Sequence, residues 1–173
     1  MRWPDLSDTL RGIPWAVAGA VATRAYMPER ATSDLDVIVL ESDAAAARER
    51  MTAAGYTHVG ERAIGGSTWR AAAGPPVDLI EGSESWLPDA LALAEANRDQ
   101  QGLPILPLAY LVLMKLGASR VQDVADVTRM LGGAADADLD QVRAVARRHA
   151  AELAEDIESL IALGQLELRG DAP

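Results

Sequence analysis

Apolar and polar positions alternate differently in the two parts of the chain. Short apolar runs with β-branched residues predict strands at residues 15–18, 34–40, 56–62, 67–72 and 77–80. Longer runs with helical periodicity predict helices at residues 6–10, 20–26, 43–54, 87–96, 108–116, 119–131, 139–149 and 151–163. Strands first and helices later indicate an α/β protein with a mixed β-sheet flanked by helices and a C-terminal helical part. We expect residues 1–100 to form the core and residues 101–173 to form the helical part packed on it.

Composition excludes several classes of protein. The chain has 173 residues, 49% of them hydrophobic, which suits one domain or a compact core with a helical extension. It has no Cys, so disulfides, thiolate zinc sites and cysteine nucleophiles are excluded. The N-terminus lacks an apolar signal core and no apolar run reaches spanning length, which predicts a soluble, cytoplasmic protein that does not contact membranes.

Two carboxylates stand one residue apart at the start of an apolar run. Asp34 and Asp36 precede Val37, and residues i and i+2 of a strand face the same side. Carboxylates aimed at one point repel each other unless a proton or a cation lies between them. Magnesium suits such oxygen ligands and often bridges to substrate phosphates, so we expect Mg²⁺ (or Mn²⁺) here. Asp78, in another short apolar run, is a candidate third carboxylate.

The residues before this acidic pair carry a family resemblance. An apolar run at residues 15–18 is followed by Gly19-Ala20, Tyr26, Arg30-Ala31-Thr32 and Asp34-Leu35-Asp36. This order and spacing resemble the DNA polymerase beta-like nucleotidyltransferase superfamily. The closer likeness is to its small bacterial branch, which includes abortive-infection and toxin-antitoxin nucleotidyltransferases. Ala20 departs from the family pattern by replacing a second Gly or Ser, and Met27 stands where a Gly often follows the Tyr.

The resemblance implies a nucleotidyltransferase fold and a role for each motif residue. Asp34, Asp36 and Asp78 would be the catalytic metal ligands, and Asp78 could also take the proton of the incoming hydroxyl. The turn at Gly19 and Ala20 would let backbone N–H groups approach the triphosphate of a nucleoside triphosphate (NTP). The side chains that would assist in binding phosphate are Arg24, Arg30 and Thr32. The implied reaction moves a nucleoside monophosphate to a hydroxyl or amine acceptor with two Mg²⁺ and releases pyrophosphate.

A second point of resemblance lies in the helical part. Lys115, Arg120, Asp123 and Asp126 match a pattern of this branch, while Gln122 replaces a Lys. By resemblance Lys115, Arg120 and Asp123 belong to the nucleotide site, with Lys115 directed at a phosphate. The alternative is that Lys115 pairs with Asp123 and joins two helices. The sequence leaves both interpretations open.

The net charge of the chain bears on the class of acceptor that it could use. The net charge of −10 argues against RNA, because affinity for nucleic acid comes largely from Lys and Arg, although a cluster at residues 143–149 is basic. That cluster is typical of a solvated helix face. The acceptor could be a protein, an RNA end or a small molecule such as an aminoglycoside or lincosamide. A different class stays open: a non-catalytic relative that acts by protein association, for instance with a cognate antitoxin or regulator.

Overall fold

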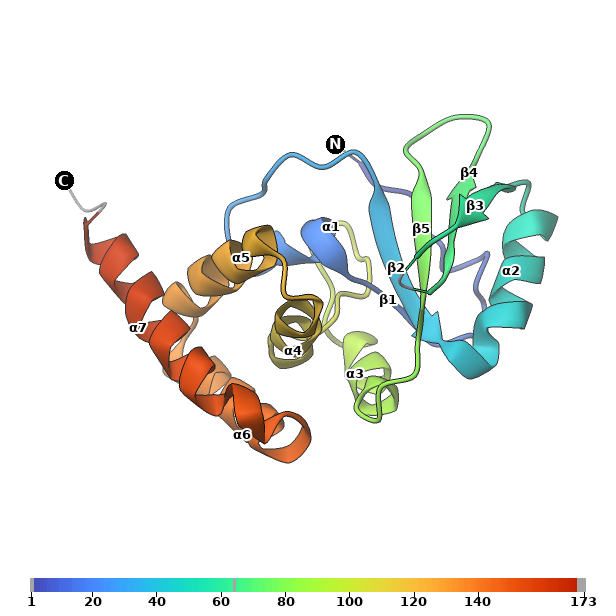
Figure 1. Ribbon diagram of the computed structural model, residues 1–173. Helices are drawn as coiled ribbons and strands as arrows, with labels where there is room; N and C mark the ends of the chain where they lie inside the picture. Colours follow the sequence, from blue (N-terminus) through green and yellow to red (C-terminus); the bar gives the residue numbers. More distant parts are fainter. Residues whose placement is uncertain (1, 64, 171–173) are drawn as a thin grey trace. The chain divides into compact units, whose positions relative to one another are not determined.

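The computed structural model of the protein describes residues 2–63 and 65–170. By packing, the chain divides into two compact units. The first comprises the residues up to 22 together with 30–106, and the second comprises 23–29 together with 107–173. Figure 1 shows the strands of the first unit and the helices of the second.

A five-stranded mixed sheet forms the centre of the first unit. Its strands are β1 (Trp15–Val17), β2 (Leu35–Leu40), β3 (Thr57–Glu61), β4 (Ser67–Arg70) and β5 (Val77–Gly82). They lie in the order β1-β2-β5-β4-β3, with β2 parallel to β5 and every other pair antiparallel (Figure 1). The expected mixed sheet is therefore confirmed. The parallel pair β2 and β5 lies in the middle, where both strands have neighbours on each side.

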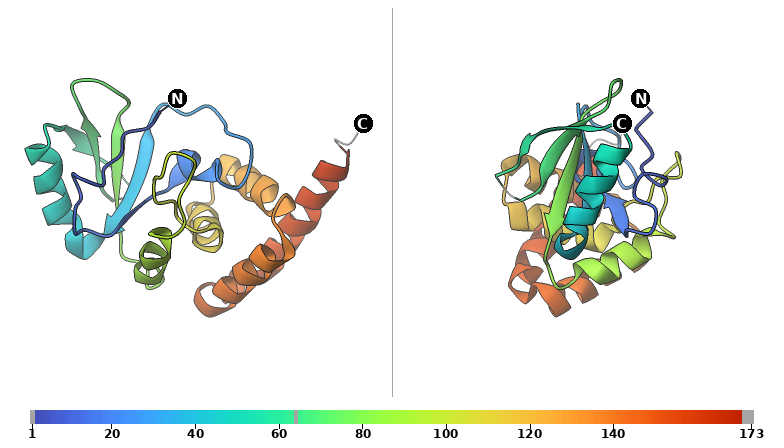
Figure 2. Two further views of the ribbon diagram at one scale, coloured as in Figure 1. Left: turned by 180° about the vertical axis from the view of Figure 1, so that it is seen from behind. Right: turned by 90° about the vertical axis from the view of Figure 1, so that its right-hand side faces the viewer.

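Helices cover both faces of this sheet. The helical segments of this part are α1 (Gly19–Thr23), the 3₁₀ turn η1 (Glu41–Asp43), α2 (Ala44–Ala53) and α3 (Leu87–Ala94). Arg48 of α2 bonds to Glu81, whereas a Cβ built on the next residue, Gly82, would meet Leu87 of α3. Successive strand residues point to opposite faces, so α2 and α3 lie on opposite sides of the sheet. The right-hand view of Figure 2 shows α2 in front of the strands.

The connection between β3 and β4 is the predicted hairpin. The amide of Arg62 donates to the carbonyl of Gly66 at 2.9 Å, and Gly66 has φ +102, a conformation that favours glycine. A Cβ on Gly66 would also overlap the backbone of Leu79 in β5. Glycine is therefore required both by the turn and by its close approach to the neighbouring strand.

The helix expected at residues 6–10 is not formed. The chain makes a single turn in which the Leu10 amide donates to the Leu6 carbonyl at 2.7 Å, and Gly12 then adopts φ +81. Both leucines are buried, so the apolar spacing reports burial of one turn rather than a helix.

The second unit contains the C-terminal helical part that was expected. Its helices are α4 (Leu108–Ala118), α5 (Val121–Gly132), α6 (Asp136–His149), the 3₁₀ turn η2 (Ala151–Leu153) and α7 (Ala154–Gly170). Helix α4 packs against α5 and α6, and α5 packs against α7. At the α5–α7 crossing, a Cβ on Gly164 would lie 2.9 Å from Cα of Gly132. No helix in the described part of the chain is long and apolar enough to cross a membrane.

Candidate functional site

Asp36 and Asp78 are direct neighbours across the two parallel central strands. Each is the second residue of its strand, and the register pairs Asp36 with Asp78. Residues in register on adjacent strands share a face, so the two carboxylates project on the same side of the sheet. That side is the one covered farther along by α3, because Ile38 and Ile80 follow at i+2 on the same face.

The two carboxylates differ in burial. Asp78 is 5% exposed, whereas the Asp36 side chain retains 19% of its accessibility. Thr68 of β4, which is in register with Asp78, donates its hydroxyl to Asp78 Oδ1 at 2.6 Å. This bond orients the buried carboxylate, and it leaves Asp36 as the more accessible member of the pair.

The start of α1 lies directly against Asp36. Gly19 has φ +57, and a Cβ built on it would overlap the Asp36 carboxylate. The amide of Ala18, the preceding residue, donates to the Asp36 carbonyl at 2.9 Å. The glycine predicted from the sequence therefore has a structural reason at this position, since only a residue without Cβ allows this approach. Ala20, the next predicted residue, is buried.

Arg62 is the residue of this site that the sequence did not reveal. It follows β3 at the start of the hairpin turn, and its Nη1 pairs closely with Asp78 Oδ2 while Nη2 lies 3.7 Å from Asp36 Oδ1. One guanidinium thus faces both carboxylates. An arginine beside a turn carries no periodic signal. The one signal in the sequence is that Arg62 is a basic residue in the predicted hairpin that precedes the strand of Asp78.

Asp34 is placed differently from the other two carboxylates. It lies one residue before β2, is half-buried, and accepts a hydrogen bond from the Thr32 hydroxyl at 2.7 Å. Within residues 2–63 and 65–170, no group of three or more His, Cys, Asp or Glu side chains is arranged to hold a metal ion. A three-carboxylate set therefore stays a prediction, whereas the pair of Asp36 and Asp78 is present.

The pair nevertheless has the chemistry of a magnesium site. Mg²⁺ is commonly held by one or two carboxylates that are completed by water and substrate phosphates. Asp36 and Asp78 supply two hard oxygen donors on one face, and the guanidinium of Arg62 already occupies a cation position on both. These residues fit a divalent cation in exchange for that guanidinium.

The remaining predicted phosphate ligands near the motif are Arg30 and Arg24. Arg30 is half-buried, in the first unit. Arg24 belongs to the second unit, and its Nη1 lies 3.8 Å from Oε1 of Glu29. Phosphate binding by Gly19, Ala20, Arg24, Arg30 and Thr32 stays a prediction.

Lys115 is the centre of a buried ion cluster in the second unit. It is 4% exposed, and its Nζ donates to Asp123 Oδ1 at 2.9 Å and to Asp126 Oδ2 at 2.8 Å. Arg120 Nε donates to the other oxygen of Asp123 at 2.6 Å, and Gln122 donates to Asp126 at 3.1 Å. The ion pair that the sequence allowed between Lys115 and Asp123 is present, with Asp126 as a second partner. A nucleotide contact for Lys115, Arg120 and Asp123 stays a prediction.

On the opposite face of the sheet, Arg48 ties α2 to two strands. It donates to Glu81 Oε1 at 2.6 Å and to both carboxylate oxygens of Glu61 at 2.8 and 2.9 Å. Hydrogen bonds from the Arg48 guanidinium lower the pKa of Glu61, and bonds to Glu61 and then Glu81 raise the pKa of Arg48. These hydrogen bonds join α2 to β3 and β5.

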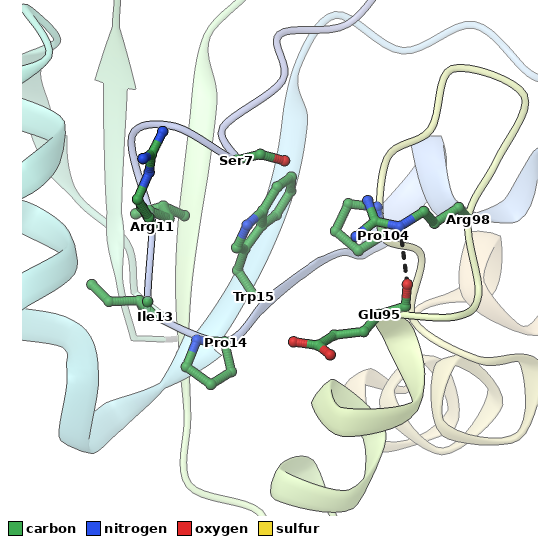
Figure 3. Close-up of a pocket in the computed structure, with 10 residues that line it drawn as sticks. Ser7, Arg11, Ile13, Pro14, Trp15, Glu95, Arg98 and Pro104 are labelled. Carbon is green, nitrogen blue, oxygen red and sulfur yellow. Dashed lines mark hydrogen bonds between the residues drawn. The ribbon is translucent and has the colours of Figure 1, made fainter.

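A small hollow lies elsewhere in the first unit. It has a volume of about 200 Å³, and Figure 3 shows Trp15, Pro14 and Pro104 among its lining residues. The side chain of Arg98 donates to the Glu95 carbonyl at 2.9 Å, the dashed line in Figure 3. Trp15 is in register with Val39, three residues along β2 from Asp36. The hollow is therefore separate from the carboxylate pair.

Comparison with known proteins gave limited similarity. No family model matches the sequence, and no curated protein matches it significantly. The chain resembles the solution structure of the antibiotic-resistance factor ANT(2'')-Ia, with a TM-score of 0.47 and 15% identity over 95% of this chain and 88% of that chain. It also resembles the crystal structure of ANT(2'')-Ia in complex with adenylyl-2''-tobramycin, with a TM-score of 0.47 and 13% identity over 95% of each chain. Likeness of this degree establishes neither a family nor a function.

Proposed function

We propose that this protein is a metal-dependent nucleotidyltransferase that moves a nucleoside monophosphate from an NTP to a hydroxyl or amine acceptor. The observation that carries the proposal is the register of Asp36 with Asp78 on two central parallel strands. Two carboxylates in this relationship repel each other unless a cation lies beside them, a place that Arg62 takes in this structure and that a divalent cation would take in the reaction. Functional sites are where such arrangements are retained.

The two carboxylates share one role in the proposed reaction, and Asp78 has a second role. Asp36, the more accessible carboxylate, and Asp78 would hold the divalent cation, and Asp34 would join them. When bound, Mg²⁺ neutralises charge on the phosphate oxygens during in-line displacement. The acceptor oxygen or nitrogen forms a bond to the α-phosphorus, the bond from that phosphorus to the bridging oxygen of the β-phosphate breaks, and pyrophosphate leaves. The acceptor's proton passes to a carboxylate oxygen of Asp78.

The net charge of the chain limits the class of acceptor. A protein with a net charge of −10 repels polyanions and attracts cations, so a cationic small molecule or a protein is favoured over RNA. A toxin-antitoxin or phage-defence setting would add a paired regulator as a partner. A neighbouring gene whose product is a small regulator that binds this protein would support that setting.

Two observations favour a second candidate, a non-catalytic protein that acts by association. Arg62 already neutralises Asp78, and Ala20 replaces the hydroxyl-bearing or glycine residue of the family pattern. If Arg62 stays permanently paired with the two carboxylates, the pair binds no metal ion and serves only to stabilise the fold. The two candidates differ in whether an NTP binds.

Thermal unfolding with each NTP, with and without Mg²⁺ or Mn²⁺ at millimolar concentration, tests the proposal. Binding to the native state raises the free energy of unfolding by about 2.7 kcal/mol at a ligand concentration of 100 times Kd. We expect this shift with wild-type protein and with Glu49→Gln, an exposed carboxylate on α2, and its loss with Asp36→Asn. Absence of any NTP-dependent shift in the wild type would favour association instead.

A further inference from the structure

We propose that Arg62 is an internal counter-ion that competes with the divalent cation for Asp36 and Asp78, so that the site opens to metal only when Arg62 is drawn away. The inference rests on the proposed function for the identity of the cation. Its structural basis is independent: one arginine from the β3–β4 hairpin faces both members of a cross-strand carboxylate pair.

The charges make the two cations mutually exclusive. Asp36 and Asp78 carry two negative charges when ionised, and Arg62 supplies one positive charge at the same oxygens. A divalent cation on these oxygens would stand beside the guanidinium with the same sign of charge. Like charges at such a separation, with the Arg62 side chain only 20% exposed, repel strongly because water screens them poorly.

The way in which Arg62 is held suits release. Its Nε is buried and finds no acceptor within the described part of the structure, so one N–H of the guanidinium is left without a hydrogen bond. A buried donor in that state loses its hydration without replacement. Moving the side chain outward returns Nε to water, which offsets part of the lost pairing with Asp78.

The position of Arg62 in the chain allows its side chain to move without the backbone. Arg62 follows the last residue of β3, and the turn closes on Gly65 and Gly66, both with positive φ. The backbone amide of Arg62 is anchored to Gly66, so the backbone can stay in place while the side chain swings. The polyphosphate of an NTP is an anion that a guanidinium binds well, so a nucleotide supplies an alternative partner for Arg62.

Competition by Arg62 predicts that metal and nucleotide assist each other's binding. Without nucleotide, a divalent cation must displace Arg62 unaided, and its affinity is low. With nucleotide, the phosphates take Arg62 and also contribute oxygen ligands, and the affinity rises. Thermodynamic linkage requires that the cation raise nucleotide affinity by the same factor.

Direct measurement of Mn²⁺ binding by electron paramagnetic resonance tests the inference without any assay of activity. We expect Arg62→Gln to bind Mn²⁺ about tenfold or more tightly than wild type in the absence of nucleotide, a typical size for coupling between two ligands. Adding a non-hydrolysable NTP should raise the affinity of the wild type for Mn²⁺ far more than that of Arg62→Gln.

Arg48→Gln is the matched control. It removes the same charge from the same unit, but Arg48 pairs with Glu61 and Glu81 on the other face of the sheet. Its Mn²⁺ affinity should stay within about threefold of wild type, which is the range below typical coupling. An equal rise in both variants would assign the effect to net charge and overturn the inference, and so would equal Mn²⁺ affinity in wild type and Arg62→Gln.

Two further results separate this inference from the proposed function. If Arg62→Gln binds Mn²⁺ tightly while no NTP binds the wild type, the counter-ion role stands and the nucleotidyltransferase fails. If NTP and Mn²⁺ bind the wild type no differently from Arg62→Gln, the proposed function stands and the counter-ion role fails.

Should Arg62→Gln fail to fold, the Nε–H signal of Arg62 in nuclear magnetic resonance spectra of wild type serves instead. The signal must shift when Mg²⁺ and a non-hydrolysable NTP are added together, and an unchanged signal overturns the inference.

Discussion

Gly19 and Asp36 are in contact in a way that no other residue at position 19 would allow. Gly19 has φ +57, and a Cβ built on its backbone would overlap the carboxylate of Asp36. The entry to α1 and the more accessible carboxylate of the pair therefore depend on each other. A change at Gly19 should affect both the stability of the fold and the position of Asp36.

Gly19→Ala tests this contact. We expect a loss of about 2–4 kcal/mol in the free energy of unfolding, from the left-handed conformation of an L-residue and from overlap with Asp36. The control is Gly12→Ala, which also has a positive φ but has no atom within 4 Å of the added Cβ. It should lose only the conformational part, about 1–2 kcal/mol. Urea unfolding of both variants measures the difference, and equal losses would contradict the contact with Asp36.

Lys115→Met tests the ion cluster of the second unit. Removal of the ammonium leaves Asp123 and Asp126, 2% and 0% exposed, without their shared cation. Loss of one partner of a buried ion pair costs on the order of 3–5 kcal/mol, and urea unfolding should show it. Arg120→Gln, which removes a 68% exposed side chain from the same cluster, should cost no more than about 1 kcal/mol. A stable Lys115→Met variant with weakened nucleotide binding would instead assign Lys115 to phosphate.

Gly164→Ala tests the crossing of α5 and α7. The added Cβ would overlap the Thr128 carbonyl and lie 2.9 Å from the amide nitrogen of Gly132. Because these are backbone atoms of α5, they cannot yield by a rotamer change, and we expect a loss of about 1–3 kcal/mol. Gly117→Ala in α4 has no atom within 4 Å of its Cβ and should gain about 0.5–1 kcal/mol from helix propensity. Thermal unfolding should move in opposite directions for the two variants.

The clasp between Arg48 and Glu61 predicts a dependence of stability on pH. Hydrogen bonding from Arg48 lowers the pKa of Glu61 below its ordinary value of 4.5. A carboxylate with a lowered pKa in the folded state stabilises the fold above its unfolded pKa, and this contribution disappears as the pH falls through the folded pKa. Urea midpoints measured from neutral pH downward should therefore fall less steeply below pH 4.5 for Glu61→Gln than for wild type. Parallel curves would show that the exposed pair contributes nothing.

Much of the first unit could be predicted because its signals are local. Apolar runs place the strands within one or two residues at most ends, and the two glycines before β4 indicate the hairpin. The helix at residues 6–10 was wrong, since its spacing of leucines serves a single buried turn. Local periodicity reports which side chains are buried, and it cannot distinguish one turn from a short helix.

The contacts within the candidate site could not be predicted from local sequence patterns. Asp36 and Asp78 were both expected from the sequence, yet their direct pairing depends on β2 and β5 being parallel neighbours in register. Arg62 was not expected, because nothing in its own segment distinguishes it from a solvated turn residue. Asp126 joined Lys115 for a similar reason, since only the packing of α4 on α5 brings it within 2.8 Å.

The sequence by itself determined the strands, the helical second part, the acidic residues and the glycine turn. These depend on the conformational preferences of a few adjacent residues and on the alternation of burial. Only the tertiary structure decided which charges meet: Arg62 with Asp78, Lys115 with two aspartates, and Arg48 with two glutamates. Each of these pairs joins side chains that lie at least eight residues apart in sequence. Their partners are selected by strand register and helix packing, which no local pattern of residues encodes.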